Sequence, residues 1–99
     1  MAYRSFAEFY PFYLSQHRDP TCRRLHFTGT ALALGCVLAA LLRDDPRWLY
    51  AALPIGYGCA WAGHLFFERN RPATFSHPFY SFAGDWVMFR DILVGRIPF

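Results

Sequence analysis

Four histidines are the residues of this 99-residue chain whose chemistry and spacing point most clearly to a site: His17, His26, His64 and His77. Imidazole nitrogens are good ligands for iron, zinc, copper and nickel. The three cysteines contain no C-x-x-C pair that would compete for such a metal. A lone histidine at the edge of an apolar segment is more often simply hydrogen-bonded, so a metal site requires that several of them converge.

Two uncharged segments, residues 25–42 and 48–67, determine where the histidines lie. A helix needs about 20 mostly apolar residues to cross the ~30 Å hydrocarbon core of a bilayer, and both segments come close to that length. Only Arg43 to Arg47 lie between them. The pattern predicts a tight antiparallel transmembrane hairpin. Two buried helices of a soluble core are the alternative, but too few residues remain to cover them.

The hairpin brings two of the histidines to the same depth. His26 and His64 are equally far from Asp45, at the centre of the turn, and each helical residue rises ~1.5 Å. Small residues recur on the His26 and His64 faces, as at Gly29 and Gly56, and small residues allow close helix packing. His17 precedes the first segment and His77 follows the second. We therefore expect all four histidines at one membrane face, where they favour a metal site.

Two carboxylates could contribute to the same site. Glu68 lies one helical turn beyond His64, where it could orient an imidazole or bind the metal directly. Asp85 could complete a two-histidine, one-carboxylate iron site. Simpler roles compete with both assignments: Glu68 as an interfacial charge and Asp85 as a helix-surface residue or the partner of an arginine. For Asp85 the simpler role is favoured.

Capping signals set the expected helix boundaries. Asp19-Pro20 and Asp45-Pro46 each read as an N-cap followed by proline at the first helical position. The flanking segments repeat aromatic residues at helical spacing, as expected of amphipathic helices at an interface. We therefore predict an all-α membrane protein with a single domain, residues 1–99, in which amphipathic helices flank the hairpin. The four expected helices cover residues 5–16, 20–43, 46–69 and 78–94.

Composition supports a membrane location. Hydrophobic residues make up 55% of the chain and charged residues only 17%, against ~25% charged in ordinary soluble domains. The net charge is +3 and all basic residues are arginine, but they form neither a run nor a helix face, so no nucleic-acid partner is expected. Arginines flank the apolar segments, which places both termini in the cytoplasm. The expected membrane is the cytoplasmic membrane of a bacterium or the endoplasmic reticulum of a eukaryote.

The motifs around the histidines resemble a known family. They read Tyr13-Leu-Ser-Gln-His17, then His26, then Gly63-His64-x-x-x-Glu68-x-x-x-Pro72-Ala73, then His77-Pro78-x-Tyr80-Ser81 and Gly84-Asp85. Over about residues 5–96 this pattern is similar to the small membrane family of Fe(II)-dependent 2-hydroxy fatty acid dioxygenases. The chain resembles a compact, bacterial-type member.

The resemblance implies an activity and a cofactor. Members shorten 2-hydroxy fatty acids by one carbon with O2, a step of fatty acid α-oxidation. By the resemblance, iron(II) is held by His17, His26 and His64, with His77 as a fourth ligand; zinc is a possible substitute. The substrate carboxylate could pair with an arginine, although these side chains could instead bind lipid headgroups. The candidate arginines are Arg23, Arg24, Arg69 and Arg71.

The residues alone are also consistent with two other classes of function. His26 and His64 at matched depth could be the axial ligands of a haem in a membrane haem protein. The chain could also be a non-catalytic membrane adaptor in which the histidines are incidental. Two spans enclose only a narrow pocket, so a homodimer is expected as a further possibility.

Overall fold

The computed structural model describes residues 3–99 and is all-α over that range. The prediction of four helices is confirmed, and three of them agree with the expected boundaries to within one residue at each end. A π-helical turn (η1) and a 3-10 turn (η2) join the last two. The elements are α1 (Phe6–Ser15), α2 (Pro20–Leu42), α3 (Arg47–Gly63), η1 (His64–Glu68), η2 (Ala73–Phe75) and α4 (Pro78–Leu93).

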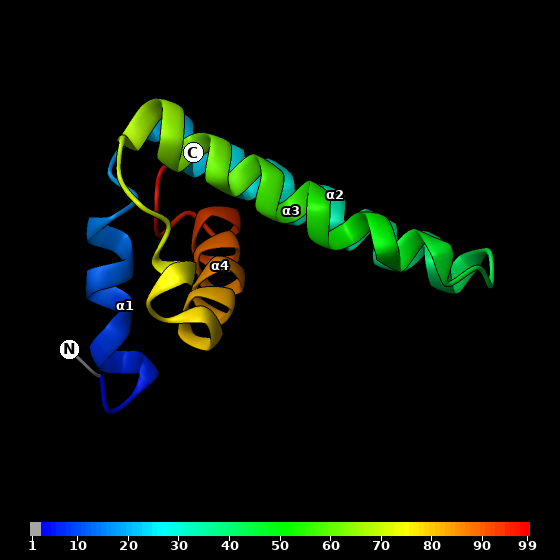
Figure 1. The fold of residues 1–99 in the computed structure, drawn as a ribbon, viewed down its shortest axis with the longest axis horizontal. Helices are drawn as coiled ribbons and strands as arrows, with labels where there is room; N and C mark the ends of the chain where they lie inside the picture. The colour runs from blue at the N-terminus through cyan, green and yellow to red at the C-terminus, as the bar shows by residue number, and fades with distance from the viewer. Residues whose placement is uncertain (1–2) are drawn as a thin grey trace.

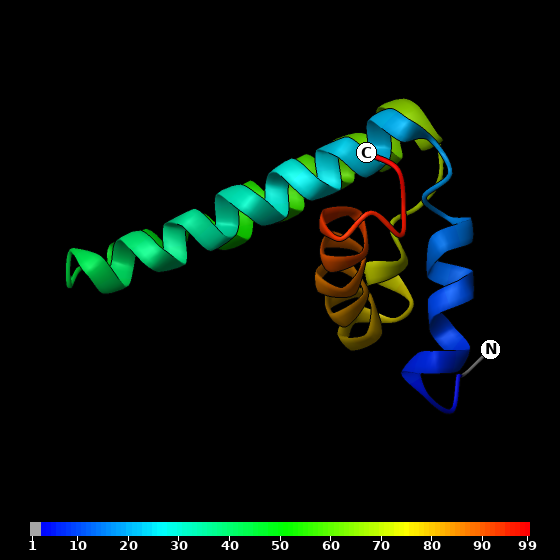
Figure 2. The same cartoon turned by 180° about the vertical axis from the view of Figure 1, so that it is seen from behind.

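The long hairpin of α2 and α3 dominates the shape of the molecule (Figure 1). α1 and α4 lie side by side at the base of the hairpin, crosswise to it and on one side of it. Seen from behind, the hairpin tip projects well beyond these two helices, and the C-terminal segment returns to the base (Figure 2). The base is thus the place where all four helices meet.

Asp19 caps the start of α2, as predicted, whereas α3 begins at Arg47 with Pro46 at its N-cap, one residue later than the Asp45-Pro46 motif predicted. The Asp19 carboxylate accepts hydrogen bonds from the backbone N–H groups of Thr21 at 2.8 Å and Cys22 at 3.1 Å, and Pro20 occupies the first helical position. In the turn of the hairpin, Asp45 accepts from the backbone N–H of Arg47 at 3.0 Å. These bonds satisfy donors that a helix start leaves free.

Small residues hold α2 and α3 close together near the base. A Cβ added at Gly29 would come within 2.7 Å of the Cys59 Cβ and 3.1 Å of the Gly56 carbonyl oxygen. One at Gly63 would meet the Cys22 Sγ at 3.0 Å. Larger side chains at these positions would push the helices apart. The predicted packing of the two small-residue faces is confirmed.

A separate aromatic core fixes α1 and α4 at the base. Phe9 and Tyr13 of α1 are buried against Met88 of α4. Outside this core the Tyr10 hydroxyl donates a 2.7 Å hydrogen bond to Asp91 of α4. Because both helices are tied to each other and to the hairpin base, their side chains can be held in fixed positions around it.

The prediction of a second membrane span over residues 48–67 is not supported as stated. The α-helix ends at Gly63 and continues as the π-helix η1, in which each turn holds an extra residue. η1 then ends at Arg69, in the left-handed region with φ 58°. Of the described residues, only α2 forms a helix long and apolar enough to cross a membrane. The hairpin is confirmed; the structure supports one candidate span within it.

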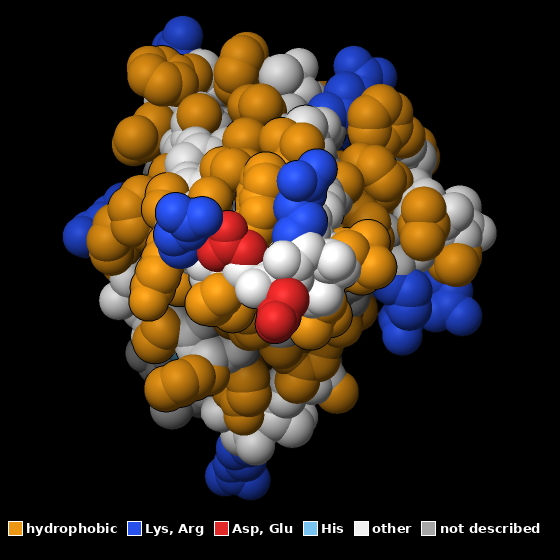
Figure 3. Space-filling view, turned by 90° about the vertical axis from the view of Figure 1, so that its right-hand side faces the viewer, with side chains coloured by type: hydrophobic (Ala, Val, Ile, Leu, Met, Phe, Trp, Pro, Cys, Tyr) orange, Lys and Arg blue, Asp and Glu red, His pale blue; other side chains and the backbone are white. Residues whose placement is uncertain are grey.

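The distal part of the hairpin exposes a large apolar surface. Only 28% of the most apolar stretch of α2 is buried within the protein. Viewed from the tip, a few charged side chains occupy the centre and hydrophobic ones surround them (Figure 3). A core helix of a soluble protein would be mostly covered. The large exposed hydrophobic side chains of this region include Leu38, Leu41, Leu42, Trp48, Leu49 and Leu53.

Candidate metal centre

Three of the four histidines converge at the base of the hairpin. His17 lies in the link between α1 and α2, His26 in α2 and His64 at the first position of η1. One ring nitrogen from each lies within 4.8 Å of the other two, and all three side chains are buried. The Nε2 atoms of His26 and His64 are 3.2 Å apart, which confirms the register predicted from their equal distance to the turn.

Two of the rings are oriented by oxygen acceptors. The Nδ1 of His17 lies 2.6 Å from the backbone carbonyl of Tyr13, and the Nδ1 of His64 lies 2.6 Å from the Oδ1 of Asn70. Carbonyl and amide oxygens only accept, so each Nδ1 carries the proton and each Nε2 presents a lone pair. Ligand imidazoles in metal sites have this outer hydrogen bond as a rule.

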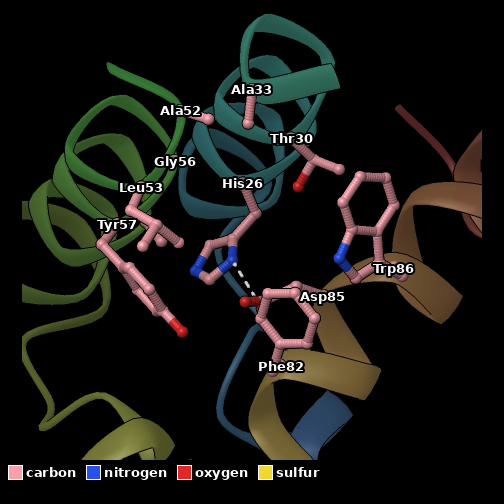
Figure 4. A pocket seen from close by; sticks show the side chains of 11 residues that line it. His26, Thr30, Ala33, Ala52, Leu53, Gly56, Tyr57, Phe82, Asp85 and Trp86 are labelled. Carbon is pink, nitrogen blue, oxygen red and sulfur yellow. Dashed lines mark ion pairs between the residues drawn. The ribbon is translucent and has the colours of Figure 1, made fainter. Parts of the chain in front are cut away.

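The third ring is oriented by a carboxylate. The Nδ1 of His26 faces the Oδ1 of Asp85 at 3.4 Å (Figure 4). The Tyr13 hydroxyl donates a short hydrogen bond to the same oxygen, which fixes the carboxylate in place. Asp85 thus stands behind His26 rather than on its Nε2 side, in the position of a residue that orients a metal ligand.

The arrangement leaves lone pairs facing one another. The Nδ1 of His26 has no hydrogen-bond partner among the described residues. If it carries the proton, as the Nδ1 of His64 does, the two Nε2 atoms have no hydrogen to share across 3.2 Å. The Nε2 of His17 is buried and has no hydrogen-bond partner among the described residues. Burial, followed by the neighbouring His26 imidazole, holds the pKa of His17 well below its ordinary value, so this ring stays neutral. Three buried Nε2 atoms, one of them without any partner among the described residues, fit a bound metal cation.

The space between the rings has the size of one ion or water. The cavity lined by the three histidines, Ser81 and Asp85 has a volume of about 10 Å³, close to the minimum that holds a single water. The Ser81 hydroxyl is buried and has no hydrogen-bond partner among residues 3–99. A porphyrin does not fit between His26 and His64, so the geometry does not support the haem alternative.

His77 does not join this group. It precedes α4, where its Nδ1 lies 2.8 Å from the Ser76 hydroxyl. Its ring packs on Phe9, with centroids 5.3 Å apart, and Phe9 in turn contacts Tyr13. Aromatic rings of α1 therefore lie between His77 and the three converging histidines.

Glu68 binds the backbone rather than a histidine. Its Oε1 accepts a short hydrogen bond from the N–H of Asp19 at the start of α2. This bond ties η1, which carries His64, to the helix that carries His26. Glu68 therefore holds two ligand-bearing segments together without reaching the space between the rings.

The candidate arginines have other partners. Arg23 donates to the carbonyls of His17 at 3.3 Å and Arg18 at 3.1 Å. Arg24 donates to the backbone oxygen of Phe99 at 2.8 Å. None of the described residues lining the cavity is an arginine.

The two arginines after α3 lie on the surface. Arg69 is exposed at the end of η1. Arg71 is also exposed, and its guanidinium lies over the Phe75 ring, 5.6 Å from the centroid. All four arginines are thus near the base of the hairpin but outside the histidine cavity.

Asn70 was not identified from the sequence as a residue of the site. Its Nδ2 donates to the backbone oxygen and the Oε1 of Gln16, both at 3.1 Å, which turns its Oδ1 towards His64. The backbone N–H of Asn70 also bonds to the His64 carbonyl at 3.1 Å. This contact depends on η1, and no periodicity or motif in the sequence indicates that turn.

The fold and site define a small helical protein with three buried histidines at the base of a hairpin, a group that could hold a metal ion. Comparison with protein families gives the identity: the family described as 2-hydroxy-palmitic acid dioxygenase Mpo1-like matches residues 3–97. The chain therefore belongs to this dioxygenase family. No curated protein and no solved structure matches it.

Proposed function

We propose that the chain is an iron(II)-dependent dioxygenase that shortens 2-hydroxy fatty acids by one carbon. The observation that carries the proposal is the three buried Nε2 atoms that face one another with every Nδ1 directed at an oxygen. Family membership supplies the reaction class and the substrate class. The metal itself, iron rather than zinc, is part of the proposal.

The reaction balances without an external reductant. One 2-hydroxy acid and one O2 give the acid one carbon shorter, CO2 and water, with the bond between C1 and C2 broken. Iron(II) in the site would supply coordination places for the hydroxy acid and for O2. The protein has to hold the ligands, orient the substrate and exclude bulk water.

Residues around the cavity suit these tasks. His17, His26 and His64 would hold the metal, and because all three ligands are neutral, the site would keep the full charge of the ion to attract a carboxylate. Asp85 and Asn70 would keep the rings in place. His77 as a fourth ligand and an arginine as partner of the substrate carboxylate remain possible additions to this set.

We further propose that the chain is one membrane-embedded domain with both termini in the cytoplasm. The exposed apolar surface of the hairpin and the candidate span α2 support the membrane location. The proposal that both termini lie on one side rests on the antiparallel hairpin, in which α3 returns the chain to the base (Figure 2). Lipid would surround the distal hairpin, and the arginines at the base would meet the headgroups. A second copy of the chain could cover part of the same surface as a homodimer.

The activity can be tested directly. Detergent-purified protein is loaded with iron(II) without oxygen, then given 2-hydroxypalmitate and O2, and the fatty acids are analysed by mass spectrometry. We expect the acid one carbon shorter and CO2. Absence of any shortened product across several chain lengths would overturn the substrate assignment. Zinc-loaded protein is the control, because zinc has no redox chemistry.

A further inference from the structure

A groove runs along the hairpin beside the histidine cavity (Figure 4). α2 and α3 form one wall with small side chains, including Ala33 and Gly56, and α4 forms the other with Phe82 and Trp86. His26 and Asp85 lie at one end. The groove is partly open along its side, so a ligand could enter without passing through the protein.

The groove and the cavity share a boundary. His26, Ala60 and Asp85 line both of them. From His26 the groove follows α2 as far as Ala33, which is about 10 Å along the helix at 1.5 Å per residue. A molecule in the groove would therefore have one end beside the ligand nitrogens and the other directed towards the hairpin tip.

Polarity changes along the groove. Near His26 the lining includes the Asp85 carboxylate and the Tyr57 side chain, whereas farther along it consists, apart from Thr30, of alanine, glycine, leucine and aromatic residues. Leu53 and Phe82 line the groove and are still about half exposed, at 59% and 48%. Apolar side chains left open beside a narrow groove are suited to an apolar ligand.

We propose that this groove is the acyl-chain subsite, with C1 and C2 of the 2-hydroxy acid at the His26 end and the methylene chain lying between α4 and the face formed by Ala33 and Gly56. The proposal rests on the proposed function and adds the position of the substrate. Because Leu53 and Phe82 line the groove and are partly exposed, longer chains can continue along the exposed hairpin. The subsite therefore favours long chains over short ones without setting an upper length.

Matched variants can narrow the groove without touching the metal ligands. Ala33→Leu fills it, and Ala31→Leu puts the same side chain on an exposed position of the same helix. Gly56→Ala is a smaller change, because its Cβ would meet the Ala33 Cβ at 3.7 Å, an ordinary contact. Gly58→Ala is its control, since a Cβ there meets nothing within 4 Å.

Binding is measured on zinc-loaded protein, so that no turnover is needed. Dissociation constants are determined for 2-hydroxypalmitate and for 2-hydroxybutyrate, whose chain ends before Ala33. We expect Ala33→Leu to weaken the binding of 2-hydroxypalmitate by about tenfold or more, because roughly two methylene groups would stay outside the groove. Binding of 2-hydroxybutyrate should be unchanged, and both controls should bind like the original protein.

The outcomes distinguish failure of the proposed acyl-chain subsite from failure of the proposed dioxygenase activity. If the original protein binds 2-hydroxypalmitate with this dependence on Ala33 but the iron-loaded form shortens no chain, the proposed function fails and the subsite stands. If Ala33→Leu and Gly56→Ala both keep the original affinities for long and short acids, the subsite is overturned. Circular dichroism and zinc content establish whether each variant is folded. If Ala33→Leu does not fold, the affinities of Gly56→Ala and Gly58→Ala for 2-hydroxypalmitate are compared instead, and a smaller loss of affinity is expected for Gly56→Ala.

Discussion

The Nε2 atoms of His26 and His64 lie 3.2 Å apart in the buried base of the hairpin, while the Nδ1 of each ring faces an oxygen acceptor. The Nδ1 of His26 has no hydrogen-bond partner among the described residues. If it carries the proton, as the Nδ1 of His64 does, the two Nε2 lone pairs face each other, and a cation beside them would stabilise the contact. His17 directs a third lone pair to the same place. This geometry makes the metal content of the protein the first quantity to measure.

We expect His26→Ala and His64→Ala to abolish stoichiometric metal binding, because each removes one of three ligands. Metal per protein is measured by elemental analysis after purification. His77→Ala is the matched comparison, since its ring packs on Phe9 and does not join the three rings; it should retain the metal. Full metal content in His64→Ala would contradict the assignment, and loss of metal in His77→Ala would make His77 a fourth ligand.

Asn70→Ala should weaken metal binding without removing a ligand. The substitution deletes the acceptor of the His64 Nδ1–H, and loss of such an outer hydrogen bond costs about 10–100-fold in metal affinity. Affinity is measured by competition with a chelator. Asn70→Asp keeps an acceptor oxygen for His64 but loses the two hydrogen bonds to Gln16, so it should restore only part of the affinity. Equal affinities in all three proteins would show that Asn70 does not orient His64.

Ser81→Ala should lower kcat/KM for the substrate and leave folding intact. The Ser81 hydroxyl lines the cavity and has no partner among the described residues, so its removal costs no internal hydrogen bond. A hydrogen bond to a charged substrate group contributes about 1.5–3 kcal/mol, and kcat/KM should fall by about tenfold or more. Thr in place of Ser81 keeps the hydroxyl and serves as the control. Lower stability with unchanged kinetics would assign Ser81 to packing instead.

The metal-free protein should lose stability as the pH falls below 6.5, the ordinary histidine pKa. Burial lowers the pKa of His17 in the folded state, so the unfolded chain binds a proton that the folded chain resists. The free energy of unfolding then falls by up to about 1.4 kcal/mol per pH unit for this residue. Denaturant unfolding on both sides of that pH measures the slope. His17→Gln should flatten it; an unchanged slope would contradict the assigned pKa.

Sequence spacing predicted the elements of the fold that depend on local rules. The Asp19-Pro20 start of α2, the hairpin and the pairing of His26 with His64 all follow from residue types and their distance from Asp45. The family resemblance supplied the expected role of the histidines as iron ligands. Most of the α-helical boundaries were therefore accessible without a structure.

The parts that could not be predicted depend on tertiary contacts. Whether α3 continues as an α-helix beyond Gly63 depends on η1, which Glu68 and Asn70 join to α2 and α1. The position of Asp85 depends on how α4 packs against Phe9 and Tyr13. A single sequence carries no periodic signal for either contact, so a helix-surface or arginine-paired role was favoured for Asp85, and the role of Asn70 was missed.

The order of the site residues along the chain has a consequence for biosynthesis. The ligands follow one another at His17, His26 and His64, whereas Asp85, the carboxylate behind His26, comes from the last helix. A nascent chain therefore possesses all three ligands before it possesses the group that orients the second one. We therefore predict that the three histidines reach their final geometry only after α4 has been synthesised and has packed against the base of the hairpin.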